Sequence, residues 1–432
     1  MNKFYLVCLF LSLLMGLSCC NSYGQHKPNL LEKPKIELLP QDIGLITGKS
    51  YVISQDIDLQ GRRCIIPPNV SLVFKGGKFK NGELHGQNTK IDYSGVVFDK
   101  VLISGSWICP VIKSSMFADL SYGNSLKDVI ALVNPNIHNK VIINEGKYIL
   151  VALKPTDSCL PVLGNTELVI NGTIELAPNE YGKYYMIHVM GDDVVVRGKG
   201  ELIGDRPKHM GKEGQWGFGI YVNKAHHVRI CDLSIRDCWG DCIYIGGKST
   251  DVVIDNCNLS YGRRQGISIT SAGDVLIKNC HISNVAGTAP EYGIDVEPNQ
   301  NDTVRNVKIR NVVIDDCIGG IMAYGNAEGA VISNVDIKNC IMYASKKIPL
   351  RFIGCQKAKA INCQLTGSAN LESVLCKDVE NAIVKRNHFY YISLKDEGVK
   401  GVIKRIIRKK ETERINLQNC VNTIVSPNWV EE

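Results

Sequence analysis

Three carboxylates in the middle of this 432-residue chain, Asp241, Asp295 and Glu297, have the residue types and spacing for acid–base chemistry. Asp295 and Glu297 are two residues apart, so they point to the same face of an extended strand. Glycoside hydrolysis uses one carboxyl that donates a proton and a second that activates water or attacks the sugar. We therefore predict that these three side chains are catalytic.

Basic, polar and aromatic residues lie close to these carboxylates in the sequence. An arginine can hold a carboxylate through two hydrogen bonds, and an aromatic ring can pack against a sugar ring. We predict no metal ligand among the site residues and, for a hydrolase, no cofactor. The expected substrate-binding residues are Arg263, Arg264, Gln265, Tyr221, Tyr244, Trp239 and Tyr292.

The elements that must position these side chains form an internal repeat. A motif of apolar residues around an asparagine recurs every 20 to 30 residues or so, and repeats of roughly this length indicate a solenoid. Asparagine tolerates left-handed backbone angles and can bond to turn amides, so the stacked copies should form a ladder at one turn. The asparagines of successive copies are Asn256, Asn279, Asn311, Asn339 and Asn362.

A second motif lies between successive copies of the first. It begins with Gly or another small residue and has apolar residues at alternate positions, as in Gly219–Val222 and Gly266–Ile269. Two short alternating strands in each repeat predict a stack of β-coils with about 5 Å between neighbouring coils. Asp241 should then lie two coils, or roughly 10 Å, from the acidic pair, a separation that favours inversion. The expected outward rows are Tyr221, Tyr244, Ser268 and Asp295, then Asn223, Gly246, Thr270 and Glu297, with Asp241 level with Gln265 and Tyr292.

The coil length, the asparagine row and the alternation resemble the pectin-lyase-like superfamily. The entry region, residues 124–131 followed by residues 141–148, is similar to the capping helix and first coil of that superfamily. The resemblance covers roughly residues 35 to 390. It implies an all-β chain, a right-handed parallel β-helix with an N-terminal β-subdomain and a capping helix.

The chain only partly resembles the polygalacturonase-type hydrolases of this superfamily. Asp241 falls on the second residue of their paired-aspartate motif, but Gly240 replaces the first. Gln265 falls on the histidine of their Gly-His-Gly motif. Asp295 and Glu297 fall where that family has basic residues that hold the carboxylate of the substrate. Because like charges repel, this implies a neutral or amino-bearing polysaccharide and not a galacturonate at this subsite.

We expect four segments in the chain. These are a signal peptide at 1–24, an N-terminal β-subdomain with early coils at 25–106, a right-handed parallel β-helix at 107–395 and a basic segment at 396–432. Lys3 followed by an apolar stretch to Leu17 is typical of an export signal. Cleavage before Gln25 would give a secreted or periplasmic protein. The alternative, a lipid anchor on Cys20, would give an outer-membrane lipoprotein.

Composition excludes a disordered chain, since 44% of the residues are hydrophobic and 22% are charged. Part of the net charge of +7 comes from the basic C-terminal segment, to which we assign no partner, and we expect no nucleic acid to bind. Cysteines recur next to the ladder asparagines, as at Cys257, Cys280, Cys340 and Cys363. We therefore expect most of the 17 cysteines to be buried free thiols and not disulfides.

Three hypotheses for function follow from the sequence. The first is a glycoside hydrolase acting on a polysaccharide through Asp241, Asp295 and Glu297. The second is a polysaccharide lyase or epimerase in which Arg263 or Arg264 acts on a uronate and the acidic residues hold Ca²⁺. The third is a non-catalytic glycan-binding surface protein.

Overall fold

The computed structural model describes residues 35–37, 44–121, 123–368, 370–392, 414–425 and 428–430. The chain divides into two compact units, Met1–Ile108 and Cys109–Glu432, so the division falls two residues after the expected boundary at 106. The expected signal peptide, including Cys20, lies outside the described residues. In the described ranges, no helix has the length and apolar character needed to span a membrane.

The first unit is a parallel β-sheet, as expected for the N-terminal β-subdomain. Its core includes Phe74, whose ring meets those of Phe79 and Phe98 edge-on at 6.0 and 6.1 Å. The strands described are β1 (Lys35–Glu37), β2 (Ser50–Ile53), β3 (Ile57–Asp58), β4 (Arg63–Ile65), β5 (Ser71–Phe74), β6 (Phe79–Asp92) and β7 (Phe98–Ile108).

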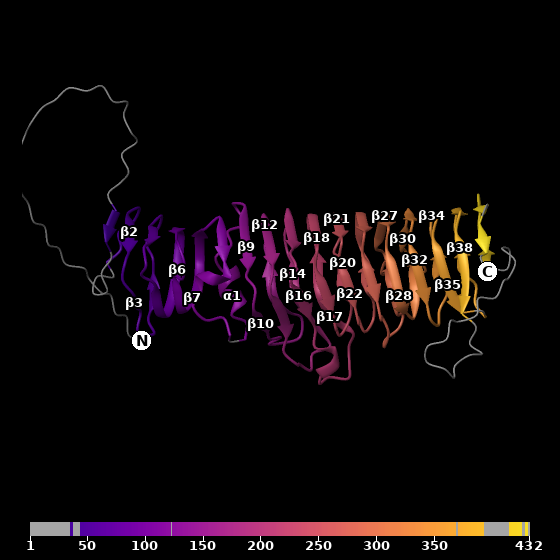
Figure 1. Cartoon of the computed structure of the whole chain (residues 1–432). Helices are drawn as coiled ribbons and strands as arrows, with labels where there is room; N and C mark the ends of the chain where they lie inside the picture. The colour runs from indigo at the N-terminus through magenta and orange to yellow at the C-terminus, as the bar shows by residue number, and fades with distance from the viewer. Residues whose placement is uncertain are drawn as a thin grey trace, which may run out of the picture. The chain divides into compact units, whose positions relative to one another are not determined.

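The second unit is a stack of coils that runs along the chain from β8 to β41, and each coil adds one strand to each of three parallel sheets (Figure 1). The sheet that carries the predicted site contains β11 (Asp157–Val162), β14 (Lys183–Val189), β17 (Trp216–Asn223), β20 (Ile243–Gly246), β23 (Ile267–Ile269), β26 (Tyr292–Val296), β29 (Gly319–Tyr324), β33 (Leu350–Ile353), β36 (Val374–Lys377) and β39 (Ile415–Gln418). We call it the site sheet.

The other two sheets complete each coil. The sheet that follows the site sheet along the chain, which we call the second sheet, contains β8 (Val111–Lys113), β9 (Asn139–Ile143), β12 (Thr166–Ile170), β15 (Val194–Arg197), β18 (His226–Cys231), β21 (Ser249–Asp255), β24 (Ala272–Lys278), β27 (Thr303–Arg310), β30 (Val331–Ile332), β31 (Val335–Lys338), β34 (Lys357–Ile361), β37 (Asn381–Lys385) and β40 (Ile424–Val425). The third contains β10 (Lys147–Leu150), β13 (Thr173–Leu176), β16 (Glu201–Ile203), β19 (Ser234–Arg236), β22 (Asn258–Ser260), β25 (His281–Ser283), β28 (Val313–Cys317), β32 (Ile341–Ala344), β35 (Gln364–Ser368), β38 (His388–Ile392) and β41 (Trp429–Val430).

Helical structure in the described residues is confined to three short segments, η1 (Ser114–Met116), α1 (Leu126–Ile130) and η2 (Arg206–Lys208). Helix α1 buries Leu126, Val129 and Ile130, and it falls where the capping helix was expected.

The coils continue beyond residue 395, where the β-helix was expected to end. Strands β39, β40 and β41 pair in parallel with β36, β37 and β38, so residues 414–425 and 428–430 contribute to another coil. Ile415 is buried opposite Val374 and extends the inward apolar row, which is the physical reason that this part of the basic segment folds back onto the stack.

Two features set the register of the coils. Inside the stack, Ile220, Ile243, Ile267 and Ile294 pair in order and have no exposed surface. At the turn, each ladder asparagine has a left-handed φ between 53° and 58°. The amides from Asn279 to Asn362 bond in series, as from Asn362 Nδ2 to Asn339 Oδ1 at 2.7 Å. Asn279 and Asn256 in turn donate to Asp255 and Asp232. The asparagine ladder predicted from the repeats is therefore present.

The cysteines of the described residues are free thiols, and most of them are buried. Cys257, Cys280, Cys340 and Cys363 lie inside the stack next to the ladder asparagines, as predicted. Their thiols serve as small apolar groups in the core.

Candidate active site

The outward rows of the site sheet have the expected register. Tyr221 pairs with Tyr244, Tyr244 with Ser268, and Ser268 with Asp295. Two residues further along the strands, Asn223 pairs with Gly246. The predicted carboxylates therefore lie on one wall, with Asp241 two coils from Asp295 and the coil of β23 between them.

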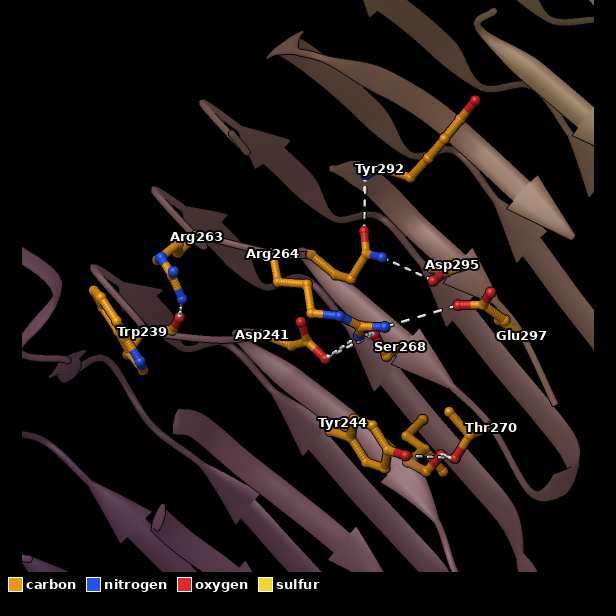
Figure 2. A network of polar contacts seen from close by, with 12 residues as sticks. Trp239, Asp241, Tyr244, Arg263, Arg264, Ser268, Thr270, Tyr292, Asp295 and Glu297 are labelled. Atoms are coloured by element: carbon orange, nitrogen blue, oxygen red, sulfur yellow. Dashed lines mark hydrogen bonds and ion pairs between the residues drawn. The ribbon is translucent and has the colours of Figure 1, made fainter. Parts of the chain in front are cut away.

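Arg264 joins two of the predicted catalytic carboxylates. Its Nη1 lies 3.2 Å from Oδ2 of Asp241, and its Nη2 lies 3.7 Å from Oε2 of Glu297. Ser268 also donates a hydrogen bond to Asp241 Oδ2, at 2.8 Å. Figure 2 shows the guanidinium of Arg264 between the two carboxylates. The structure thus brings Asp241 and Glu297 together through a cation that fills the space between them.

Asp295 is held by an amide of fixed orientation. Gln265 Nε2 donates to Asp295 Oδ2 at 2.7 Å, while Gln265 Oε1 accepts from the backbone N–H of Tyr292 at 2.8 Å. Since the oxygen of the amide is already engaged by an N–H, its NH₂ group must face the carboxylate. Gln265 therefore positions Asp295 beside Glu297. We call Asp241, Arg264, Gln265, Ser268, Asp295 and Glu297 the acidic cluster.

The carboxylates of the acidic cluster differ in their contact with solvent. Asp241 and Asp295 are 0% and 1% exposed, whereas the side chain of Glu297 is 35% exposed. Burial raises the pKa of Asp241 from 3.8 to about 6, against the opposing charge of Arg264. Burial also raises the pKa of Asp295 well above its usual range, and the neighbouring charge of Glu297 adds to this shift. Asp295 therefore binds its proton more tightly than an ordinary aspartate does.

Among the residues described, the acidic cluster contains buried polar atoms without hydrogen bonds, which lower the stability of the fold and are not needed to stack the coils. No hydrogen bond reaches Asp241 Oδ1, Asp295 Oδ1 or Arg264 Nε within the described part of the chain, although all three atoms are buried. Native proteins leave few buried polar atoms unpaired, because each one costs about 1–3 kcal/mol. Unpaired carboxylate oxygens with shifted pKa values, gathered on one wall, are typical of a functional site.

Beside the acidic cluster, the site sheet carries a cavity of about 380 Å³ at the carboxyl ends of its strands. Two of the predicted substrate-binding residues, Tyr221 and Tyr244, line it. Thr270 connects the two features, because its hydroxyl bonds to the hydroxyl of Tyr244 at 2.8 Å and its row continues to Glu297. The full lining is Tyr221, Asn223, Lys224, Tyr244, Gly246, Gly247, Lys248, Thr270, Ser271, Asn299 and Asp302.

Trp239 and Arg263 have partners other than those expected. The guanidinium of Arg263 lies 3.7 Å from the centroid of the Trp239 ring, and the ring of His209 stacks on Trp239 at 3.8 Å. Two groups this close to one centroid must cover opposite faces of the ring. Trp239 therefore has no free face for a sugar. Arg263 donates to the backbone carbonyl of Gly214, and it lies apart from Arg264 in Figure 2.

Tyr292 is 1% exposed, so its ring is not a surface that a sugar can reach. It packs against Gly319, where an added Cβ would lie 2.6 Å from the ring, and it points away from Asp295 in Figure 2. Its contribution to the acidic cluster is its backbone N–H, which orients Gln265.

Sequence reasoning did not assign a site role to Ser268, Thr270 or His209. The first two lie in the outward rows, so the repeat register could have identified them. His209 lies in the segment between β16 and β17, where its Nδ1 is 2.8 Å from the buried carboxylate of Asp205. No repeat extends into that segment, so no pattern pointed to His209.

No group of three or more His, Cys, Asp and Glu side chains in the described ranges is placed to hold a metal ion. The carboxylates of the acidic cluster are instead occupied by Arg264, Ser268 and Gln265.

Comparison with known proteins agrees with this architecture. Residues 218–369 match the family model described as "Right handed beta helix region". The fold of the chain is therefore a right-handed parallel β-helix. The predicted likeness to the pectin-lyase-like superfamily is thus confirmed at the level of the fold.

Two proteins of Bacillus subtilis (strain 168) are similar to this β-helix chain. The SPbeta prophage-derived uncharacterized protein YorA is 26% identical over 48% of this chain, and the uncharacterized protein YclG is 28% identical over 42%. The chain spans only 41% and 36% of the lengths of these relatives. Among solved structures, an exopolygalacturonase from Thermotoga maritima is 13% identical, with a TM-score of 0.42 over 70% of this chain and 89% of its own.

Proposed function

We propose that this β-helix is a glycoside hydrolase that cleaves a polysaccharide on the wall formed by the site sheet. The observation that carries the proposal is the acidic cluster, in which the buried Asp295, whose pKa is raised, lies beside the partly exposed carboxylate of Glu297. The adjoining cavity, lined by Tyr221 and Tyr244, supplies the aromatic surface that sugar binding commonly uses.

In the proposed reaction, Asp295 donates its proton to the glycosidic oxygen as the bond to the sugar carbon breaks. Glu297 accepts a proton from the water that attacks this carbon. Asp295 is 1% exposed, so in this reaction its carboxyl reaches the substrate only after a local side-chain movement. Asp241 holds Arg264 in place, since the guanidinium fills the space between Asp241 and Glu297.

The electrostatics of Arg264 favour hydrolysis over the arginine-based lyase or epimerase. Burial lowers the pKa of Arg264, but the neighbouring acidic side chains, Asp241 foremost, outweigh that effect and raise it. A guanidinium with a raised pKa is a poor proton acceptor. Its charge is already neutralised by carboxylates, which leaves little positive charge for a uronate.

A panel of plant and microbial polysaccharides tests the proposal, with each reaction run with and without a chelator. We expect new reducing ends without absorbance from unsaturated products. Glu297→Gln and Asp295→Asn should each lower turnover by about 100-fold or more, the usual effect of losing an acid or base. Asp274→Asn is the matched control, because Asp274 pairs with Arg305 on the second sheet. Unsaturated products or a need for calcium would favour the lyase, and full activity of both site variants would refute the assignment.

We also propose that the protein is exported through residues 1–24. Sequencing the N-terminus of the mature protein distinguishes free secretion, which gives Gln25, from a blocked N-terminus at a lipidated Cys20. Recovery of a mature chain that still begins at Met1 would contradict export.

A further inference from the structure

The cavity beside the acidic cluster is open because one row of the site sheet lacks a side chain. In the row that leads to Glu297, Gly246 lies between Asn223 and Thr270. A Cβ built at Gly246 would lie 3.0 Å from Tyr244 Cε1 and 3.1 Å from Thr270 Oγ1, closer than ordinary van der Waals contact. A larger side chain at this position would therefore occupy the floor of the cavity.

Two lysines at the rim give this cavity a charge opposite to that of the acidic cluster. Lys224 and Lys248 follow the ends of β17 and β20, both are exposed, and neither makes an ion pair or a hydrogen bond through its ammonium group in the described ranges. The one carboxylate in the lining, Asp302, already accepts hydrogen bonds from Ser271 at 3.0 Å and from Asn299 at 3.2 Å. The lining thus carries one net positive charge.

The neighbouring acidic cluster has more carboxyl groups than cationic groups. It holds the carboxyl groups of Asp241, Asp295 and Glu297 and the single guanidinium of Arg264. One wall of the β-helix therefore has a cluster rich in carboxyl groups and, beside it, a positively charged cavity. A substrate bound across the acidic cluster and the cavity should have positive charge at the cluster and negative charge at the cavity.

We propose that the cavity binds a sugar residue with an acidic substituent, a carboxylate or a sulfate ester, held by Lys224 and Lys248. This inference rests on the proposed function, since it places the acidic sugar next to the neutral or amino sugar that meets the acidic cluster. The substrate class is then a heteropolysaccharide in which an acidic sugar neighbours a neutral or amino sugar. The hydroxyls of Tyr221 and Tyr244 supply further hydrogen bonds to the same sugar.

Binding to a glycan array tests the proposal without turnover, with the full chain carrying Glu297→Gln. The array contains uronate-bearing glycans and sulfated glycans, each paired with its uncharged counterpart. Comparing the uronate set with the sulfate set shows which acidic group the cavity binds. We expect at least one acidic glycan to bind more tightly than its counterpart. Lys224→Ala/Lys248→Ala should weaken that binding about tenfold or more, as expected for losing a charge-assisted hydrogen bond, and should leave neutral glycans unaffected.

Lys308→Ala/Lys357→Ala is the matched control, because it removes two exposed lysines from β27 and β34 of the second sheet. Gly246→Val gives an independent readout, since filling the cavity should weaken binding of acidic and neutral glycans alike. The inference is overturned if no acidic glycan binds better than its counterpart, or if the lysine variant at the cavity behaves like its control. Binding without turnover by the unsubstituted chain would overturn the hydrolase proposal and leave the cavity assignment intact.

Discussion

Arg264 Nη1 lies 3.2 Å from Asp241 Oδ2, so a largely buried cation neutralises a carboxylate that has no exposed surface. The same guanidinium extends to the half-exposed Glu297. This relationship links the interior of the acidic cluster to its surface, and it implies that stability and activity at this site depend on the same residue.

Arg264→Gln should lower the free energy of unfolding by about 3–5 kcal/mol, because it leaves a buried carboxylate without its counter-charge. Denaturant unfolding of both proteins measures the difference. Arg305→Gln is the control, since its pair with Asp274 is exposed and should contribute less than about 1 kcal/mol. Equal effects of the two substitutions would contradict the interpretation of Arg264.

Asp241→Asn should change how stability depends on pH. The pKa of Asp241 is raised to about 6 in the folded chain, from 3.8, so the unfolded chain ionises first as pH rises. As pH rises from 4 to 6 or so, the free energy of unfolding of the wild-type chain therefore falls by about 3 kcal/mol relative to that of the variant. Above that range, the difference between the two proteins is constant. Thermal or denaturant unfolding across this range provides the test. A relative stability that rises with pH would show that the pKa is lowered.

Arg263→Ala should loosen the segment between β16 and β17 without weakening glycan binding. The substitution uncovers one face of Trp239 and removes a cation–π contact of about 0.5–2 kcal/mol. We expect faster hydrogen exchange in residues 204–215 and glycan affinity within about twofold of wild type. Tyr221→Ala should show the reverse pattern, because Tyr221 lines the cavity. Loss of affinity in Arg263→Ala alone would restore its predicted role in substrate binding.

Asn339→Ala should destabilise the stack more than Asn339→Gly. Both substitutions remove the side-chain bonds to Asn311 and Asn362, at 3.4 and 2.7 Å. Alanine must also adopt the left-handed φ of 55°, which costs about 1–2 kcal/mol that glycine avoids. Comparing the unfolding free energies of the two variants tests the ladder. Equal losses would indicate that the turn imposes no backbone strain.

Much of the architecture could be predicted from the sequence, because a repeat leaves little freedom. Once inward isoleucines and turn asparagines recur in each copy, a one-residue slip would expose the core, so only one register remains. That register predicts Ser268 between Tyr244 and Asp295, and the strands pair in this order. It also placed Asp241, Arg264 and the acidic pair on one wall.

The tertiary structure decided what the side chains do within that register. Arg263 and Arg264 are adjacent in sequence, yet one covers a tryptophan and the other binds two carboxylates. The outcome depends on the segment between β16 and β17, which brings His209 against Trp239 and has no counterpart in the repeat. Backbone periodicity determines which face a residue is on. Burial, rotamer and pKa depend on non-repeating contacts from distant parts of the chain, which no local pattern encodes.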